Sequence, residues 1–443
     1  MKIQLSDHFT YRRLLKFVFP SVIMMIFTSI YGVIDGLFIS NFVGKTSFAA
    51  INLVMPFIMV LGGFGFMIGT GGSALVAKKL GEGDAQKANQ YFSMLVWFTL
   101  IIGIFFSIIG IVFSRPVAYF LGATESMIRD CVLYSQISFI FNTCYMYQNL
   151  FQSFLVTAEK PKLGLISTIA AGLTNIVLDA LFIAVFHWGV SGAALATGFS
   201  QCVGAAIPFI FFARKNDTPL HIIRTNLKLH VLLKTCSNGA SELLNNVASC
   251  IVAIMYNFQL LRFIGENGIA AYGVLMYIQF IFVAIYVGYA IGSAPIISYH
   301  YGAQNHNELK NMLKKSSLLM GISGICMTIL AQFLAIPLAK IFVGYDAELF
   351  SLTVHAFRIF AFSFILCGMN IFTSSFFTAL NNGAVSAIIS FLRTLVFQLI
   401  CVFLLPVIFD IDGIWLAIAF AEVCAFIISL LFLISKRKQY HYI

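Results

Sequence analysis

Residues 49–77 read AAINLVMPFIMVLGGFGFMIGTGGSALVA and contain no Lys, Arg, Asp or Glu. This run is longer than the about 20 apolar residues that an α-helix needs to cross a bilayer. The rest of the chain is similar, because 60% of the 443 residues are hydrophobic and only 10% are charged. Soluble domains carry about 25% charged residues. The composition, with a mean hydropathy of +0.94, excludes a soluble protein and predicts an integral membrane protein.

Apolar runs separated by charged residues, Gly or Asn predict twelve transmembrane helices. Helices are expected rather than a barrel, since the runs are long and continuously apolar instead of alternating over ten residues. The longest polar stretch, Arg214 to Lys234, divides six helices from six, and 214–230 is expected to be a cytoplasmic connection between an N-lobe (1–213) and a C-lobe (231–443). The predicted spans are 14–41, 49–77, 91–114, 127–156, 163–187, 191–213, 231–262, 269–300, 315–343, 349–379, 384–409 and 413–435.

Lys and Arg predict the orientation, because cytoplasmic loops carry an excess of both. They gather at the N-terminus, in the connection, after 435 and in the loops on that same side. The opposite loops carry only Lys45, Arg115, Arg129, Arg262 and Lys340. Both termini are therefore expected in the cytoplasm. The basic residues form short clusters at membrane flanks, so the net charge of +10 does not indicate a nucleic-acid partner.

An internal repeat divides the chain. A shift of 221 residues aligns residues of distinctive type in corresponding spans, among them Gly44 with Gly265, Gly81 with Gly302, Pro116 with Pro337, Asn149 with Asn370 and Gly192 with Gly413. Six helices per half keep the same orientation, so we expect two pseudo-symmetric, parallel six-helix lobes. Such repeats are typical of carriers that bind substrate between the lobes and rock about it.

Two acids inside predicted spans are the best candidates for a cation-coupling site. Asp35 and Asp179 lie on the order of 10 Å from the outer surface at about 1.5 Å per helical residue. Asn175 precedes Asp179 by one turn, Thr28 precedes Asp35 by two turns, and Thr197 lies at a similar depth. Two neighbouring carboxylates can share a proton, and their oxygens suit Na⁺, which prefers oxygen ligands. The shift pairs Asp35 with Tyr256 and Asp179 with Ile400, so coupling is expected in the first half alone.

Glu242, Glu422, Arg358 and Arg393 are charged residues inside spans of the second half. Glu242 has no obvious basic partner, so it is a candidate for binding a cationic substrate or relaying a proton. Glu422 and Arg393 lie at mid-depth on adjacent antiparallel spans, which favours a structural ion pair. We find no phosphate-binding loop, nucleophile elbow or metal-ligand spacing. We therefore expect no enzyme and no cofactor, with energy drawn from an ion gradient.

Several motifs together resemble one family. They are DGLFI at 35–39, LGEGD at 80–84 with Lys87 and Ala88 after it, its echo YGAQN at 301–305, the stretch from Asn175 to Asp179, and GAALAT at 192–197. In their order and spacing these resemble the multidrug and toxic compound extrusion (MATE) family, of the multidrug/oligosaccharidyl-lipid/polysaccharide flippase superfamily. The resemblance runs over essentially the whole chain.

The resemblance implies a bacterial inner-membrane exporter that exchanges H⁺ or Na⁺ for amphiphilic organic cations, such as drugs or dyes. It also implies a cation site at Asp35, Asn175, Asp179 and Thr197. Aromatic residues that could contact drugs are Tyr147, Phe151, Tyr256 and Tyr277. The protein is expected to contact membrane lipid and to work as a monomer.

Two alternatives stay open on the sequence alone. The first is a lipid-linked oligosaccharide flippase of the same superfamily, although such flippases often carry extra helices and a strongly cationic cavity. The second is a passive channel or receptor, which would act without any gradient. Efflux that depends on an ion gradient would distinguish the exporter from both.

Overall fold

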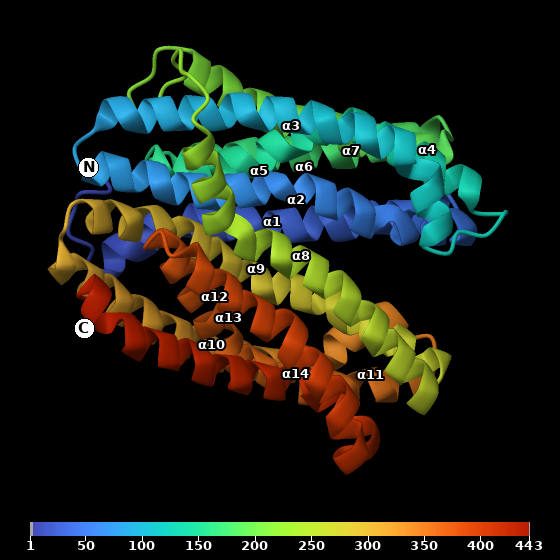
Figure 1. The fold of residues 1–443 in the computed structure, drawn as a ribbon. Coiled ribbons are helices and arrows are strands. Elements are labelled where there is room, and N and C mark those ends of the chain that lie inside the picture. The colour runs from blue at the N-terminus through green and yellow to red at the C-terminus, as the bar shows by residue number, and fades with distance from the viewer. Residues whose placement is uncertain (1–2, 443) are drawn as a thin grey trace.

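Long α-helices that run along one axis make up the computed structural model, which describes residues 3–442 (Figure 1). The side chains of Leu37, Ser40, Asn41 and Lys45 lie outside the described part. No strand occurs between residues 3 and 442. The helices are α1 (Tyr11–Phe42), α2 (Lys45–Gly81), α3 (Ala85–Phe120), α4 (Ile128–Ile140), α5 (Asn142–Thr157), α6 (Pro161–Asp179), η1 (Ala180–Val185), α7 (Gly189–Ala213), α8 (Leu229–Phe263), α9 (Glu266–Gly302), α10 (His306–Val343), α11 (Ala347–Phe360), η2 (Ala361–Ser363), α12 (Phe364–Ala379), α13 (Gly383–Phe391), η3 (Leu392–Val396) and α14 (Phe397–Tyr440).

Ten helical segments of the described chain are long and apolar enough to cross a membrane. Two departures separate this number from the twelve predicted spans. The span 127–156 is divided at Phe141 into α4 and α5, and neither piece alone is long enough to count. The last two predicted spans join in one segment, although Asp410 (φ 50°, ψ −133°) breaks its helical backbone between them. The chain is a multi-pass membrane protein, and the number twelve stays a prediction.

The repeat appears in the helix boundaries. Helices α2 and α9 begin and end 221 residues apart. The next helices, α3 and α10, start through equivalent N-caps: the Asp84 side chain accepts from the backbone N–H of Lys87, and Asn305 accepts from Glu308. Such caps satisfy backbone donors that the first turn leaves free. The two halves therefore share local structure as well as sequence.

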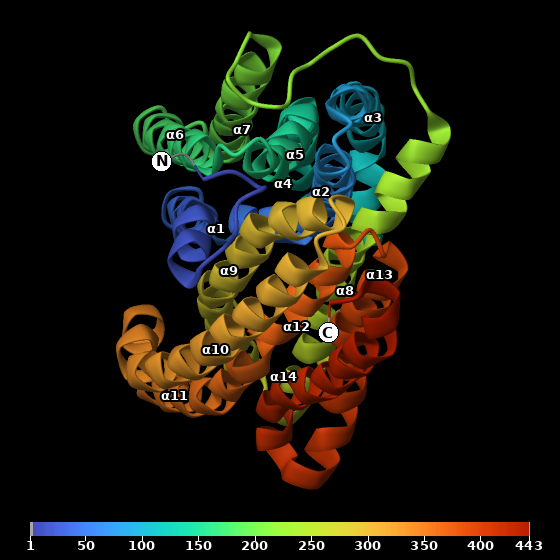
Figure 2. The ribbon, with the colours of Figure 1, turned by 90° about the vertical axis from the view of Figure 1, so that its left-hand side faces the viewer.

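The helices form two groups, which Figure 2 shows end-on: the N-terminal bundle (α1–α7) and the C-terminal bundle (α8–α14). They meet through α2 against α8 and α1 against α9, two pairs that the repeat exchanges. Contact is closest near the end that holds both termini. A Cβ on Gly239 would overlap the Met67 carbonyl, and one on Gly302 would overlap that of Lys78. Toward the other end, Gly32 and Gly273 have open space around them, and Figure 1 shows α8 diverging from α2.

The N-terminal segment crosses between the bundles at this closed end. The backbone N–H of Leu5 donates to Glu159 Oε1 at 2.9 Å, and that of Phe9 donates to Glu308 Oε1 at 2.9 Å. Glu159 follows α5, whereas Glu308 lies in the first turn of α10. Leu5 and Phe9 are fully buried among residues of α9, α10 and α12. This segment, which we call the N-terminal strap (residues 5–9), thus ties the two bundles together.

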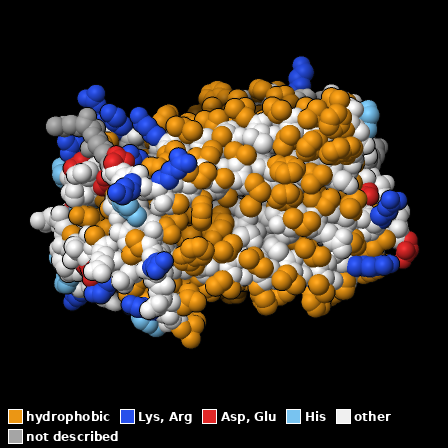
Figure 3. Space-filling model, turned by 90° about the horizontal axis from the view of Figure 1, so that it is seen from above, with side chains coloured by type: hydrophobic (Ala, Val, Ile, Leu, Met, Phe, Trp, Pro, Cys, Tyr) orange, Lys and Arg blue, Asp and Glu red, His pale blue; other side chains and the backbone are white. Residues whose placement is uncertain are grey.

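A wide apolar surface covers the middle of the molecule. Figure 3 shows hydrophobic side chains over most of one face, with Lys and Arg gathered mainly at one end and a few at the other. Exposed residues such as Ile101, Phe105, Ile108 and Val112 follow one face of α3 at helical spacing. In water such a surface would be an aggregation site, whereas in a bilayer it faces lipid.

Candidate functional site

The predicted coupling residues meet inside the N-terminal bundle. Asp35 lies on α1, Asn175 and Asp179 on the last turns of α6, and Thr197 on α7. Asp179 and Asn175 are 0% and 1% exposed, and Asp35 is 9% exposed. The Asp35 carboxyl faces both Asp179 and Asn175, and the Asn175 amide donates to Thr197 Oγ1 at 3.5 Å. Three helices distant in sequence therefore converge on one buried polar cluster.

The oxygens of this cluster are short of partners. Within the described residues, both carboxylate oxygens of Asp179, Oδ1 of Asp35 and Oδ1 of Asn175 are buried and have no donor other than a proton that the two facing acids could share. A buried polar group without a partner costs about 1–3 kcal/mol, and a charged one costs more. A proton or a cation bound between the two acids would give these oxygens partners.

The backbone widens directly after the acid. Residues Ala180–Val185, which follow Asp179, form the π-helix η1. Single π-turns in α-helices are uncommon and often occur at functional sites, because the extra residue re-aims the side chains beside it. Here the π-helix begins immediately after Asp179, whose two carboxylate oxygens are both among the buried oxygens named above.

The Thr28 side chain forms a hydrogen bond within its own helix. Its hydroxyl donates to the Met24 carbonyl at 2.9 Å, within its own helix. Ser and Thr hydroxyls inside helices often form this bond with the preceding turn, which removes them from side-chain networks. A role for Thr28 in cation coupling stays a prediction.

Tyr134 is a site residue that the sequence did not reveal. It lies on α4, is 1% exposed, and faces both Asp35 and Asp179. Its phenol can donate a hydrogen bond to a carboxylate, which suits a carboxyl group that changes protonation state. Asp130 lies one turn before Tyr134 but accepts a hydrogen bond from Ser47 instead, so only the packing of α4 beside the cluster identifies Tyr134.

The four predicted drug-contacting aromatics lie in different places. Tyr147 stacks on Phe151 with ring centroids 5.5 Å apart, and its hydroxyl donates to the Val96 carbonyl, all within the N-terminal bundle's core. Tyr256 stacks on Tyr272 in the C-terminal bundle. For these three, contact with drugs stays a prediction.

Tyr277 occupies a different position, at the boundary between the bundles. It is 37% exposed, and its hydroxyl lies 3.9 Å from the Cβ position of Gly36, the residue after Asp35. Its ring stacks on that of Phe342, which lies on α10 of the C-terminal bundle. Of the four aromatics, Tyr277 is thus the one that the fold brings from the other bundle to the edge of the acid cluster.

Glu242 lies apart from this cluster, on α8. No ion pair engages it within the described part of the chain. Asn238 and Asn245, one turn on either side, are both occupied: Asn238 donates to the Gly71 and Thr378 carbonyls, and Asn245 accepts from Thr394. Glu242 is therefore a partly exposed acid between two fixed amides, facing the region where α8 leaves α2.

The predicted pair between Arg393 and Glu422 is present. The guanidinium contacts Glu422 Oε1 at 2.7 Å, and Asn370 donates to Glu422 Oε2 at 2.7 Å. The Glu422 side chain is 3% exposed. Each oxygen of this buried carboxylate thus has a partner, unlike those of Asp179. Because the pair is complete, it is a structural element of the C-terminal bundle.

A resident metal centre is not apparent in residues 3–442, where no three His, Cys, Asp or Glu side chains gather. The donors at the acid cluster are two carboxylates, one amide oxygen and one hydroxyl. Such hard oxygen ligands suit a proton or an alkali cation rather than a transition metal.

Comparisons with known proteins agree with this architecture. The MatE family model matches residues 20–181 and 241–404, and the two matches begin 221 residues apart. The multidrug export protein MepA of Staphylococcus haemolyticus is 24% identical over 424 residues, which cover 94% of this chain and 92% of that protein. MepA of Staphylococcus aureus (strain MRSA252) is 23% identical over 421 residues, with the same coverage.

Solved structures share the fold at low sequence identity. A crystal structure of a MATE protein in complex with MaL6 superposes with a TM-score of 0.93 at 20% identity, covering 98% of both chains. An outward-facing multidrug resistance MATE transporter superposes with a TM-score of 0.91 at 21% identity, covering 97% of this chain and 96% of that one. With most of its length matched by the family model in two repeats, the chain belongs to the MatE family, the MATE transporters that its motifs resemble.

Proposed function

We propose that this protein is a secondary active multidrug exporter that exchanges H⁺ or Na⁺ for amphiphilic organic cations. The observation that carries the proposal is the buried pair Asp35 and Asp179, whose oxygens lack partners inside the N-terminal bundle. The names of the MepA relatives support drugs as substrates. The protein acts as a transporter rather than an enzyme and needs no cofactor besides the coupling ion.

Transport proceeds by alternating access, in which the two bundles act as the N-lobe and C-lobe and rock about the site between them. Close packing of Gly239 and Gly302 against the opposite bundle seals the end that holds the termini. At the opposite end α8 diverges from α2 (Figure 1), and Gly32 and Gly273 have open space around them. We assign this arrangement to an outward-open state of a bacterial inner-membrane protein with twelve spans and both termini in the cytoplasm, as the distribution of Lys and Arg favours.

Coupling follows from competition between the ion and the substrate. Asp35 and Asp179 bind the incoming H⁺ or Na⁺, with Asn175 and Thr197 completing the oxygen set. Tyr277 transmits the change, because its hydroxyl lies beside Gly36 while its ring belongs to the other bundle. Glu242, unpaired on α8, attracts the cationic drug, which aromatic rings then hold through cation–π contacts. One elementary charge crossing about 100 mV supplies about 2.3 kcal/mol for this cycle.

Ethidium efflux tests the proposal. Drug-sensitive cells would express the wild-type chain, Asp35→Asn, Asp179→Asn, or the control Glu348→Gln, an exposed acid at the start of α11. We expect the wild type and the control to export ethidium and both Asp variants to lose export. Wild-type efflux should stop when one of the two gradients, proton or sodium, is collapsed and continue when the other is. The gradient that arrests efflux names the ion. Efflux that survives both Asp substitutions would refute the coupling role.

The flippase alternative predicts a different outcome. Its cavity would need free cationic side chains for a pyrophosphate, yet Arg393 is already neutralised by Glu422. If a deletion strain accumulated lipid-linked sugar precursor with unchanged drug sensitivity, the flippase would replace the exporter.

A further inference from the structure

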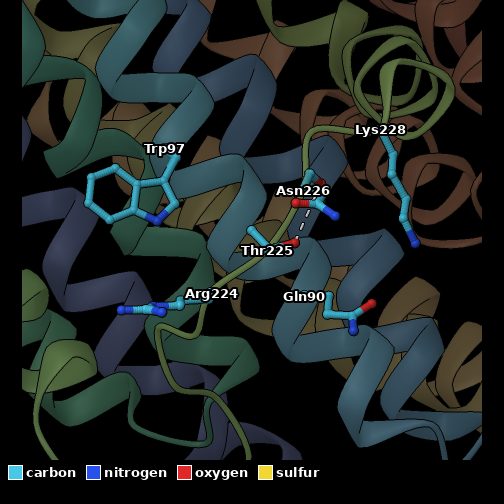
Figure 4. A pocket seen from close by; sticks show the side chains of 6 residues that line it. All are labelled: Gln90, Trp97, Arg224, Thr225, Asn226 and Lys228. Atoms are coloured by element: carbon cyan, nitrogen blue, oxygen red, sulfur yellow. Dashed lines mark hydrogen bonds between the residues drawn. The ribbon is translucent and has the colours of Figure 1, made fainter.

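A polar hollow lies on the outside of the molecule, away from the acid cluster. It has a volume of about 670 Å³ and lies between α3 and the connection that leads from α7 to α8. Figure 4 shows the side chains that line it: Gln90, Trp97, Arg224, Thr225, Asn226 and Lys228. Two of these six are cationic and none is acidic. No residue of the hollow belongs to the coupling site or to the boundary between the bundles.

The connection that forms one wall is fixed in place. Asn89 on α3 donates to the Pro219 carbonyl at 2.9 Å and accepts from the N–H of His221 at 2.6 Å. One turn further along α3, Ser93 accepts from the N–H of Ile223 at 2.8 Å. Leu220, a residue of the connection, is fully buried. The connection is therefore docked along α3, and the hollow has two ordered walls.

The cations of the hollow have no internal counterion. Within residues 3–442, no acid forms an ion pair with Arg224 or Lys228. The one acid in the connection, Asp217, contacts Lys160 at 2.8 Å instead. Figure 4 shows Arg224 and Lys228 at opposite sides of the hollow. Two positive charges and the side-chain amides of Gln90 and Asn226 thus border a space that suits an anion with several oxygens.

The lower edge of the hollow belongs to the membrane. Trp97 is 43% exposed and starts the stripe of exposed apolar residues that continues along α3 through Ile101 and Phe105. Leu229 and Leu233, at the start of α8, are also exposed. Trp is enriched at the boundary between acyl chains and headgroups. A phosphate above Trp97 and an acyl chain below it would follow the polarity of this surface.

We propose that the hollow binds the headgroup of an anionic phospholipid, with Arg224 and Lys228 on either side of that headgroup and an acyl chain along the α3 stripe beside Trp97. The lipid contacts α3 of the N-terminal bundle and the residue before α8 of the C-terminal bundle. The lipid therefore links the N-terminal and C-terminal bundles at the surface where the connection lies. The anionic lipid content of the membrane then sets how readily the two bundles separate. The inference rests on this hollow and is independent of the proposed substrate and coupling ion.

Native mass spectrometry of the purified full-length protein tests the site with palmitoyl-oleoyl phosphatidylglycerol against the matching phosphatidylcholine. We expect selective retention of phosphatidylglycerol by wild type. The variant R224Q/K228Q should bind it more weakly, by about fivefold per removed charge near a membrane surface. The control R214Q/K215Q removes the same charge from the same connection outside the hollow and should retain the lipid. Equal loss in both variants, or no loss in R224Q/K228Q, would overturn the site.

A second measurement leaves the basic pair intact. The chain has three Trp, so W188F/W415F keeps Trp97 as the only Trp. In nanodiscs at equal lipid fractions, brominated phosphatidylglycerol should quench Trp97 more than brominated phosphatidylcholine. Equal quenching by the two lipids would overturn the proposal. Displacement of the bound lipid by free sn-glycerol 3-phosphate would also overturn it, in favour of a soluble phosphate ligand.

Discussion

Replacing buried acids should separate those that hold the fold together from those that couple ions. Glu422 has Arg393 and Asn370 as partners, whereas both oxygens of Asp179 and one of Asp35 have none. Glu422→Gln leaves the Arg393 guanidinium buried without its counterion. Breaking such a pair costs about 3–5 kcal/mol. Asp35→Asn replaces a poorly partnered carboxyl by a neutral amide of the same size, so its unfolding free energy should be unchanged or slightly higher.

The assay is unfolding of the purified protein by SDS in mixed micelles, beside ethidium efflux by the same variants in cells. We expect Glu422→Gln to lose about 3–5 kcal/mol of unfolding free energy. Asp35→Asn should keep its stability and lose efflux. The double variant Arg393→Met/Glu422→Gln should recover most of the stability, because no uncompensated charge remains. The exposed control Glu348→Gln should change stability by less than about 0.5 kcal/mol.

One result would refute this reasoning directly. If Asp35→Asn lost as much stability as Glu422→Gln, the Asp35 carboxylate would have a stabilising partner, and its unpaired oxygen would carry no functional meaning. The number of hydrogen-bond and ion-pair partners of a buried carboxylate would then not identify the coupling site.

Three further variants test the remaining geometry. Gly239→Leu would place a side chain against the Met67 carbonyl, so we expect the end that holds the termini to open, with increased crosslinking or thiol labelling there. Glu308→Ala leaves the buried N–H of Phe9 unpaired at a cost of about 1–3 kcal/mol, and we expect faster proteolysis within the N-terminal strap. Tyr134→Phe removes a phenol that faces both acids, so efflux should fall at least tenfold while protein yield stays unchanged; normal efflux would exclude Tyr134 from coupling.

The sequence predicted the acid cluster because charge inside an apolar span is informative. Asp35 and Asp179 stood out by their cost in a bilayer, and helix periodicity placed Asn175 on the face of Asp179. Periodicity also placed Thr28 on the face of Asp35 but could not show that its hydroxyl donates to the Met24 carbonyl in its own helix. Nor could it identify Tyr134, because the packing of α4 against α7, the helix that carries Thr197, joins segments distant in sequence.

The direction in which an aromatic side chain points was harder to predict than the position of a buried acid. A helix that is apolar all round has no polar face from which its orientation follows. Tyr147 and Phe151 could therefore be named but not oriented, and they lie in the N-terminal bundle's core. The helix break at Asp410 was foreseeable from the polar residues around 410, whereas the division at Phe141 had no such signal.

The two halves use one scaffold for different purposes. The repeat pairs Asp35 with Tyr256 and Asn149 with Asn370. In the C-terminal bundle Tyr256 stacks on Tyr272, and Asn370 holds a completed ion pair. In the N-terminal bundle the equivalent region contains acids whose oxygens are unpaired. A rocking carrier needs only one half to respond to the ion, and the other half works best as a rigid body against which the response is exerted. The asymmetry of partners between the halves thus supports coupling in the N-terminal bundle, with Tyr277 as the contact across the boundary.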